Sequence, residues 1–271
     1  IESPSRTMLT GNTLVFDIET VPDTVTGSRI WGLMGIEDDD QVKAMRAKRL
    51  EKTGYTDFIA HHLHKIVAIS AALRSSDGFK IWSIGDANSN EKELLERFFR
   101  GIEKFEPVLV SWNGGGFDLP VIHYRSLLHS VEAPHYWEVG ETNRAYRYNN
   151  FINRFHWRHI DLMDVLSGFQ PRAGAPLHEI ALLLGLPGKL GMKGSDVWSA
   201  YRSGQIDEIR NYCETDVLNT YLIYLRFEQI RGKLTGAELQ REYERVQRAL
   251  SEEGYPHLQE FLEHWQSACS T

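Results

Sequence analysis

Four carboxylates and one tyrosine are the side chains of this sequence best suited to chemistry. Asp17 and Glu19 lie two residues apart in TLVFDIET, Asp118 follows the glycine run of WNGGGFD, and YCETD holds Tyr212 and Asp216. Carboxylate oxygens are the ligands that Mg²⁺ and Mn²⁺ prefer in proteins. If the fold brings these acids together, the sequence predicts a site for hard divalent cations.

The first pair of acids belongs to an expected strand, Thr13–Ile18, which is rich in β-branched and aromatic residues. Strand side chains alternate between faces, so Val15, Asp17 and Glu19 share one face. Two carboxylates at the end of an apolar strand repel each other and lose hydration. They require a cation, a shared proton or several hydrogen-bond donors. The alternative for this pair alone is a frayed strand end in water.

Asp118 follows a short expected strand, Val108–Trp112, and a run of glycines. Glycine permits the backbone angles of a sharp turn from strand to helix, so Asp118 should open the helix Asp118–His129 at the carboxyl end of a strand. Open α/β sheets often bind ligands there. The alternative is an ordinary helix-capping aspartate.

Asp216 lies on the long expected helix Ile206–Ile230, beside an apolar stripe that includes Cys213 and Val217. Tyr212 is four residues earlier and therefore on the same face. A carboxylate beside a core-facing stripe should be paired or metal-bound. The alternative is a carboxylate at the rim of the core.

The remaining pattern indicates a mixed α/β sheet in one domain. Asp77-Gly78 predicts the turn of a hairpin between two strands, and helical periodicity follows. These further elements are the strands Lys65–Leu73 and Phe79–Ile84, the helices Glu91–Phe105, Asp161–Leu166 and Leu177–Leu184, and a helical pair after Thr235.

Residues 8–271 are expected to form this single domain, with residues 1–7 as a polar tail ahead of Met8. Residues 23–64 form a long polar insertion that includes the helical pattern Asp39–Lys52 and could act as a lid. Its histidines, His61, His62 and His64, are expected on a hydrated surface. Residues 235–271 form a C-terminal helical extension.

Composition bounds the function. The chain has 271 residues, 42% of them hydrophobic and 25% charged, which is ordinary globular usage. No apolar run has the roughly 20 residues of a membrane span. The two cysteines, Cys213 and Cys269, suggest neither a disulfide framework nor a zinc site, so we expect a cytoplasmic protein.

The net charge of −7 leaves two alternatives. Either the protein does not bind nucleic acid, or it holds a short strand end locally, with bound cations that offset its own acidity.

Three motifs together resemble those of the DEDD exonuclease superfamily: DIET (Asp17–Thr20), SWNGGGFDLP (Ser111–Pro120) and YCETD (Tyr212–Asp216). The Y-x-x-x-D form is similar to the DEDDy branch. More narrowly, the chain resembles stand-alone 3′→5′ exonucleases related to the proofreading domain of family B DNA polymerases. Supporting stretches are HIDLMDVL (His159–Leu166) and LLGLPGKLGMKGSDVW (Leu183–Trp198), and the resemblance spans Leu14 to Leu234.

The resemblance implies a ribonuclease H-like fold, whose five-stranded sheet has its second strand antiparallel to the rest and helices on both faces. It also implies two divalent metal ions, Mg²⁺ or Mn²⁺. Asp17 would bridge both ions, Glu19 and Asp216 would hold the water-side ion, and Asp118 would act through water on the other. Tyr212 would orient the attacking water, as a hydrogen-bond donor because tyrosine titrates near pH 10.

The expected partner is the 3′ end of a nucleic acid, with single-stranded DNA favoured over RNA by the resemblance. An RNA-trimming exoribonuclease and a catalytically silent nucleic-acid-binding protein are the alternatives. Arg144 and Arg147 alternate with aromatic residues, which is typical of single-strand binding and equally of a packing loop with solvated arginines. Asp161 is expected to cap a helix. The predicted substrate-binding residues are Thr20, Asn113, Phe117, Arg144, Arg147, Lys189 and Lys193.

Overall fold

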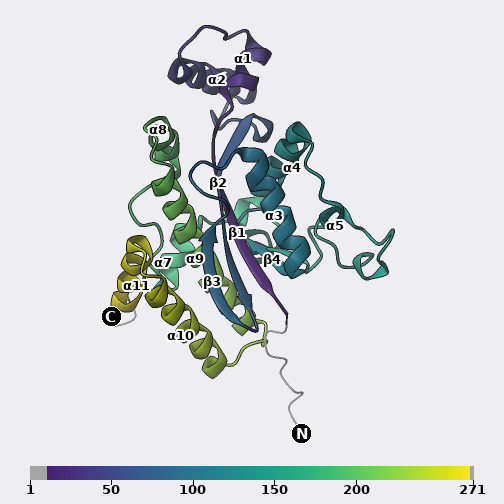
Figure 1. Ribbon diagram of the computed structural model, residues 1–271, viewed down its shortest axis with the longest axis vertical. Coiled ribbons are helices and arrows are strands. Elements are labelled where there is room, and N and C mark those ends of the chain that lie inside the picture. The colour runs from purple at the N-terminus through teal and green to yellow at the C-terminus, as the bar shows by residue number, and fades with distance from the viewer. Residues whose placement is uncertain (1–10, 269–271) are drawn as a thin grey trace.

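The computed structural model describes residues 11–268 and contains one five-stranded mixed sheet (Figure 1). The strand order is β3-β2-β1-β4-β5. β2 runs antiparallel to β1 and β3, and β4 is parallel to β1 and β5, so β2 alone opposes the other four. This is the sheet expected of a ribonuclease H-like fold. The strands are β1 (Thr13–Pro22), β2 (His64–Ser75), β3 (Gly78–Ser83), β4 (Val108–Ser111) and β5 (His159–Asp161). The predicted tail at residues 1–7 and Cys269 lie outside the described residues.

Alternating side chains of β1 supply both faces of the sheet with apolar surface. Leu14, Phe16 and Ile18 are buried under α3 (Glu91–Phe105) and α4 (Asp118–His129). Val15 is buried on the other face against Val217 of α9 (Ile206–Ile230). Helices therefore cover both faces, as the resemblance implied. α9 is long because its segment from Tyr212 to Leu225 is buried on all sides.

Several bounds differ from those predicted. β1 continues to Pro22 because its pairing with β2 resumes after a bulge between Glu19 and Thr20. The predicted helix Asp161–Leu166 was wrong at its first residue: Asp161 ends β5, and α6 covers Leu162–Leu166. A three-residue strand is too short to show periodicity. The helices α3, α4 and α9 have the bounds that the sequence predicted.

The remaining helical elements are short or peripheral. α10 and α11 form the expected C-terminal pair, and α8 was not predicted. No helix within residues 11–268 is long and apolar enough to cross a membrane. These elements are α5 (Pro134–Trp137), η2 (Arg144–Tyr146), η3 (Pro171–Ala173), α7 (Leu177–Leu183), η4 (Gly194–Asp196), α8 (Val197–Arg202), α10 (Gly236–Glu253) and α11 (Pro256–Ala268).

Residues 23–64 form a separate helical lobe beyond the end of β1, at the top of Figure 1. It contains α1 (Thr24–Trp31), α2 (Asp38–Thr53) and η1 (His61–Leu63). The predicted helix Asp39–Lys52 thus corresponds to α2. Met45, Ile59 and Leu63 form a small core of the lobe's own.

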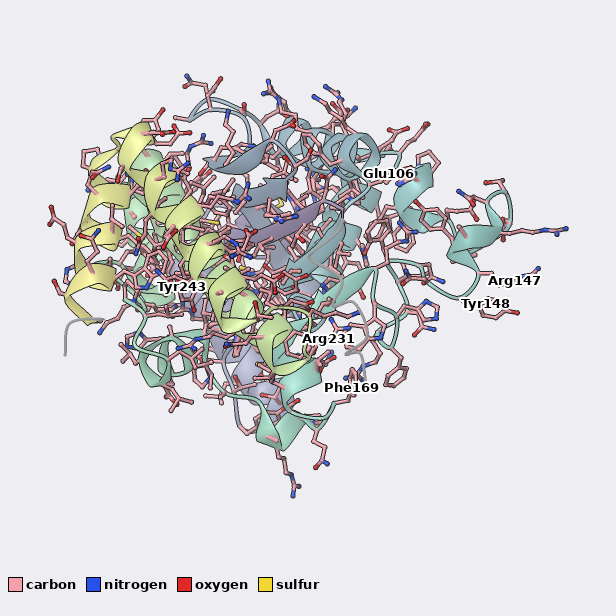
Figure 2. All side chains as sticks on the ribbon, turned by 90° about the horizontal axis from the view of Figure 1, so that it is seen from below. Glu106, Arg147, Tyr148, Phe169, Arg231 and Tyr243 are labelled. Atoms are coloured by element: carbon pink, nitrogen blue, oxygen red, sulfur yellow. The ribbon has the colours of Figure 1, made fainter. Side chains whose placement is uncertain are left out.

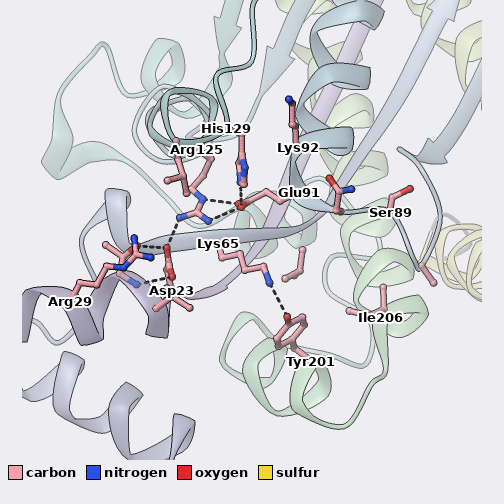
Figure 3. A pocket seen from close by; sticks show the side chains of 16 residues that line it. Asp23, Arg29, Lys65, Ser89, Glu91, Lys92, Arg125, His129, Tyr201 and Ile206 are labelled. Carbon is pink, nitrogen blue, oxygen red and sulfur yellow. Dashed lines mark hydrogen bonds and ion pairs between the residues drawn. The ribbon is translucent and has the colours of Figure 1, made fainter. Parts of the chain in front are cut away.

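A buried ion-pair cluster fixes the root of this lobe (Figure 3). Arg125 of α4 lies 2.6 Å from Asp23, the residue that caps α1, and 2.6 Å from Glu91, the first residue of α3. Glu91 also accepts the backbone N–H of Ile66 in β2 at 2.6 Å. The cluster borders a cavity of about 700 Å³, and it couples the lobe to two helices and a strand of the sheet.

Candidate active site

β1 carries the first two acids on the face that meets α9. Asp17 pairs across the ladder with Ser70 of β2, and Glu19 pairs with Ala68. The bulge follows directly after Glu19, and bulges commonly lie beside functional sites, where they re-aim side chains. Asp17 is half-buried and Glu19 is 9% exposed, so neither acid is at a frayed strand end.

The glycine turn after β4 is held by Asp161. Its carboxylate accepts the backbone N–H groups of Asn113 and Gly115, each at 2.9 Å. A Cβ on Gly115 would lie 3.2 Å from Asp161 Oδ2, and one on Gly114 would clash with the Ser111 side chain, so side chains at these glycines would displace the residues that shape the turn. Asp161 also accepts from Asp164 N at 3.3 Å, which confirms the predicted helix cap.

This turn aims Asp118 back at the central strand. Asp118 is the first residue of α4 and is 4% exposed. Its Oδ1 accepts the backbone N–H of Ile18 at 3.1 Å, between the two acids of β1. Asp118 therefore does not serve as a solvent-exposed helix cap.

α9 brings Tyr212, Cys213 and Asp216 to the same place. Asp216 is 6% exposed and Tyr212 is 3% exposed, and the charge of Asp216 helps to raise the pKa of the Tyr212 phenol. Cys213 Sγ lies 3.4 Å from the Asp17 carbonyl oxygen and 3.5 Å from Asp17 Oδ2. The ligand atoms of Asp17, Glu19 and Cys213 lie within 4.8 Å of one another. The sequence placed Cys213 in an apolar stripe and missed this contact, which depends on how α9 lies across β1.

Lys189, one of the predicted substrate-binding residues, lies beside these acids. Its Nζ is 2.5 Å from the Tyr212 hydroxyl oxygen and 3.6 Å from Asp216 Oδ2. The preceding Gly188 is held by Asn219 of α9 through two hydrogen bonds, at 3.1 and 2.9 Å. The segment that carries Lys189 is thereby fixed to the same helix as Tyr212 and Asp216.

The acids perturb one another. Burial, and after it the charges of the neighbouring carboxylates, raises the pKa of Asp17 well above its ordinary value. Burial likewise raises the pKa of Glu19, while the positive charge of Lys189 lowers it in part. Burial raises the pKa of Asp118 to about 7 although the Ile18 N–H opposes the change. A further cation beside these acids, in addition to Lys189, would relieve this repulsion.

The residues present fit a hard divalent cation. Asp216 Oδ1 is buried and has no hydrogen-bond partner among the residues that the structure describes. A buried carboxylate oxygen without a donor is destabilising unless a cation satisfies it. The converging oxygens of Asp17, Glu19, Asp118 and Asp216 are the ligand type that Mg²⁺ and Mn²⁺ prefer.

Three of the predicted substrate-binding residues line a cavity at the mouth of this site. The cavity has a volume of about 570 Å³ and borders Glu19, Thr20, Asn113 and Phe117. Thr20 Oγ1 lies 2.9 Å from His64 Nδ1, and the other ring nitrogen of His64 lies 3.0 Å from the Ile59 carbonyl. His64 is 7% exposed, so its expected place on a hydrated surface was wrong.

Lys193 has a different position. Its side chain is exposed, and its backbone N–H donates to Asp196 Oδ2 at 3.0 Å. The next residue, Gly194, lines the cavity, so Lys193 lies near its rim.

Arg144 and Arg147 are not brought to the site. They lie in the segment that enters β5 at its amino end, whereas the acids lie at the carboxyl ends of parallel strands. Figure 2 shows Arg147 and Tyr148 pointing outward, and Tyr148 is 81% exposed. The alternation of arginine and aromatic residues therefore reflects, in part, local packing: Arg158 stacks at 4.0 Å from the centre of the Tyr146 ring.

Fold and site together define an α/β protein of ribonuclease H-like topology, with a carboxylate cluster at the carboxyl end of its central strands. The chain belongs to the family of predicted 3′-5′ exonucleases related to the exonuclease domain of family B DNA polymerases, whose model matches residues 56–265. That match includes Asp118, Tyr212 and Asp216, and begins after Asp17 and Glu19.

Curated relatives are polymerases of much greater length. A DNA polymerase of Archaeoglobus fulgidus is 23% identical over 161 residues, 58% of this chain and 19% of the polymerase. The catalytic polypeptide of DNA polymerase epsilon from Saccharomyces cerevisiae is 25% identical over 149 residues, 51% of this chain and 6% of that polypeptide. This chain thus spans a fifth or less of these relatives.

Among solved structures, the family B DNA polymerase of Pyrobaculum calidifontis is similar to 91% of this chain. The similarity covers 29% of that polymerase, with a TM-score of 0.43 and 16% identity.

Proposed function

We propose that this chain is a metal-dependent 3′→5′ exonuclease of the DEDDy type that removes nucleotides from the 3′ end of single-stranded DNA. The observation that carries the proposal is that four buried or half-buried acids lie close enough for their charges to interact, and one of them, Asp216, has an oxygen with no partner among the described residues. Family membership supports the direction of hydrolysis.

Asp17, Glu19, Asp118 and Asp216 would hold two divalent ions, Mg²⁺ or Mn²⁺. When bound, such ions activate a water molecule for attack on a phosphodiester and stabilise the leaving 3′-oxygen. The repulsion among these acids supports this assignment, because raised carboxylate pKa values are expected where a cation belongs.

Tyr212 would position the attacking water. Burial and the charge of Asp216 raise the pKa of its phenol, so the hydroxyl keeps its proton and acts as a hydrogen-bond donor rather than as a general base. Lys189, whose ammonium group reaches the Tyr212 hydroxyl, would neutralise charge on the phosphate under attack.

The test is degradation of 5′-labelled single-stranded DNA and RNA of one sequence, with Mg²⁺, with Mn²⁺ and with chelator. A descending ladder that requires metal supports the proposal, and a faster reaction on DNA than on RNA supports the substrate. A protein that binds metal and remains folded but leaves both substrates intact is instead a silent binding module.

A further inference from the structure

The insertion of residues 23–64 crosses the mouth of the candidate active site and is anchored on both sides of it. On one side, His61 Nε2 lies 2.9 Å from the carbonyl oxygen of Gly116, in the glycine turn. The Phe58 ring lies 5.6 Å from the ring of Phe117 in the same turn.

The second anchor joins the start of α2 to α8. Arg202 Nη1 lies 2.6 Å from Asp38 Oδ2, and Trp198 Nε1 donates to Asp39 Oδ1 at 2.9 Å. α8 and the glycine turn are far apart in sequence, and the insertion contacts both of them.

The cavity of about 570 Å³ lies beneath this bridge. Glu19 and Thr20 line its catalytic side, and Arg46 and Phe58 line it from the insertion. Its volume lies within the range of about 300 to 1,000 Å³ usual for ligand pockets. The insertion therefore contributes a wall to the same cavity as a catalytic acid.

That wall has the chemistry of a nucleotide site. Phe58 is 53% exposed, although its ring lies 5.6 Å from the ring of Phe117 and 5.3 Å from that of His64, so part of the Phe58 ring remains accessible to a base. Arg46 is exposed and forms no ion pair with any residue in the described part of the chain. By contrast, Lys48 on the same helix pairs with Glu51 at 3.0 Å.

The backbone at Phe58 is held by the same helix. Arg49 Nε of α2 donates to the carbonyl oxygen of Phe58 at 3.0 Å. Because α2 carries both Arg46 and this contact, the aromatic ring and the exposed guanidinium are positioned by one element.

We propose that the insertion is a substrate-binding strap: Phe58 stacks on a base of the unpaired 3′ end, Arg46 binds a backbone phosphate, and the Asp38–Arg202 and Asp39–Trp198 contacts keep the strap closed. This inference rests on the proposed exonuclease function. Because the insertion is attached on both sides of the cavity, a strand can enter beneath it only by its free end. A paired 3′ end must therefore separate from its complement before it enters. The strap therefore makes the enzyme selective for unpaired ends.

The first experiment measures binding of a fluorescein-labelled oligothymidylate by anisotropy in chelator, which prevents hydrolysis. Phe58→Ala should raise Kd about fivefold or more, the effect of losing one base-stacking contact. Arg46→Ala should lower the slope of log K against log salt by about 0.7, the contribution of one phosphate contact on a single strand. The matched control, Lys48→Ala, removes the same charge from the same helix and should leave the slope unchanged.

The second experiment tests the strap with two substrates, a single strand and a blunt duplex. Arg202→Asp should raise the rate on the duplex relative to the single strand, and the exchange Asp38→Arg with Arg202→Asp should restore the wild-type ratio. Circular dichroism melting of each variant identifies any that fail to fold. If the Arg202 or Asp38 variants do not fold, the binding results for Phe58→Ala and Arg46→Ala decide whether the strap binds substrate.

The outcomes separate the two ideas. A wild-type protein that degrades single strands with metal, combined with variants at Phe58 and Arg46 that bind like wild type, overturns the strap and leaves the exonuclease standing. A wild-type protein that neither binds nor degrades DNA overturns both.

Discussion

The ammonium nitrogen of Lys189 lies 2.5 Å from the hydroxyl oxygen of Tyr212. Both residues lie at the edge of a buried acidic cluster, where Lys189 also reaches Asp216 at 3.6 Å. A lysine in this position offsets negative charge without occupying the place of a metal ligand, because it is held mainly through the phenol. Mutation of Lys189 can therefore distinguish a role in supporting the reaction from a role in organising the acids that would bind metal.

Lys189→Ala should reduce kcat by roughly 10 to 100-fold, the scale of losing a supporting charge-assisted contact. Affinity for Mn²⁺ should stay constant or increase, because the remaining acids lose a competing cation. Titration calorimetry with Mn²⁺ and steady-state kinetics measure the two effects. Lys80→Ala, a change of the same charge at an exposed position of β3, is the control. A large loss of metal affinity in Lys189→Ala would show that the lysine instead organises the acids.

Tyr212→Phe should lower kcat by about 10²-fold, the low end for loss of a positioned proton donor. The substitution leaves the carboxylates in place, so Mn²⁺ binding should remain within about twofold of wild type. Single-turnover hydrolysis and metal titration are the measurements. An unchanged kcat would remove Tyr212 from the reaction.

Asp17→Ala should abolish metal-dependent hydrolysis, with a loss of at least about 10³-fold. Thermal stability without metal should be unchanged or higher, because Asp17 lies beside other acids whose charges oppose its ionisation. Melting in chelator tests this expectation. A clear destabilisation would indicate that Asp17 supports the fold rather than a cation site.

The metal-free protein should lose stability as pH rises from about 5 to 8. Burial raises the folded-state pKa of Asp118 to about 7, from an ordinary value of 3.8, and raises that of Glu19 as well. A raised folded pKa means that the folded state binds more protons, so its contribution is full at low pH and disappears as pH passes the folded pKa. Melting temperatures in chelator should show this fall, and Mg²⁺ or Mn²⁺ should reduce it. A rise in stability over this window contradicts the assignment.

Arg125→Met should destabilise the protein by about 3–5 kcal/mol, the usual effect of removing one partner from a buried ion pair. Asp23 and Glu91 would be left buried without their guanidinium partner. Denaturant unfolding measures the loss. Lys92→Met, at an exposed neighbour of Glu91, should change stability by less than about 1 kcal/mol.

The sequence predicted those parts of the structure that depend on local signals. α9 and α4 have the predicted bounds because helical periodicity and the glycine turn are visible in the chain itself. The face shared by Asp17 and Glu19 follows from strand alternation alone.

Features set by tertiary register could not be predicted. The approach of Cys213 to Asp17 depends on the seating of α9 across β1, and the anchor between Asp38 and Arg202 joins segments distant in sequence. β5 is too short to show a pattern. The spacing of Arg144 and Arg147 carries no information about which end of the sheet they occupy.

The hydrogen bond from Ile66 to Glu91 lies at an edge of the sheet. β3 pairs with β2 from Ser70 to Ser75, and Ile84 N donates to Ile69 O, so within residues 11–268 the start of β2 has no strand paired on that side. Exposed edges of this kind recruit strands of other molecules and lead to aggregation. The Glu91 carboxylate occupies a donor that an incoming strand would require, and Arg125 holds the carboxylate there. We therefore expect the cluster that fixes the root of the insertion also to oppose self-association through this edge of the sheet.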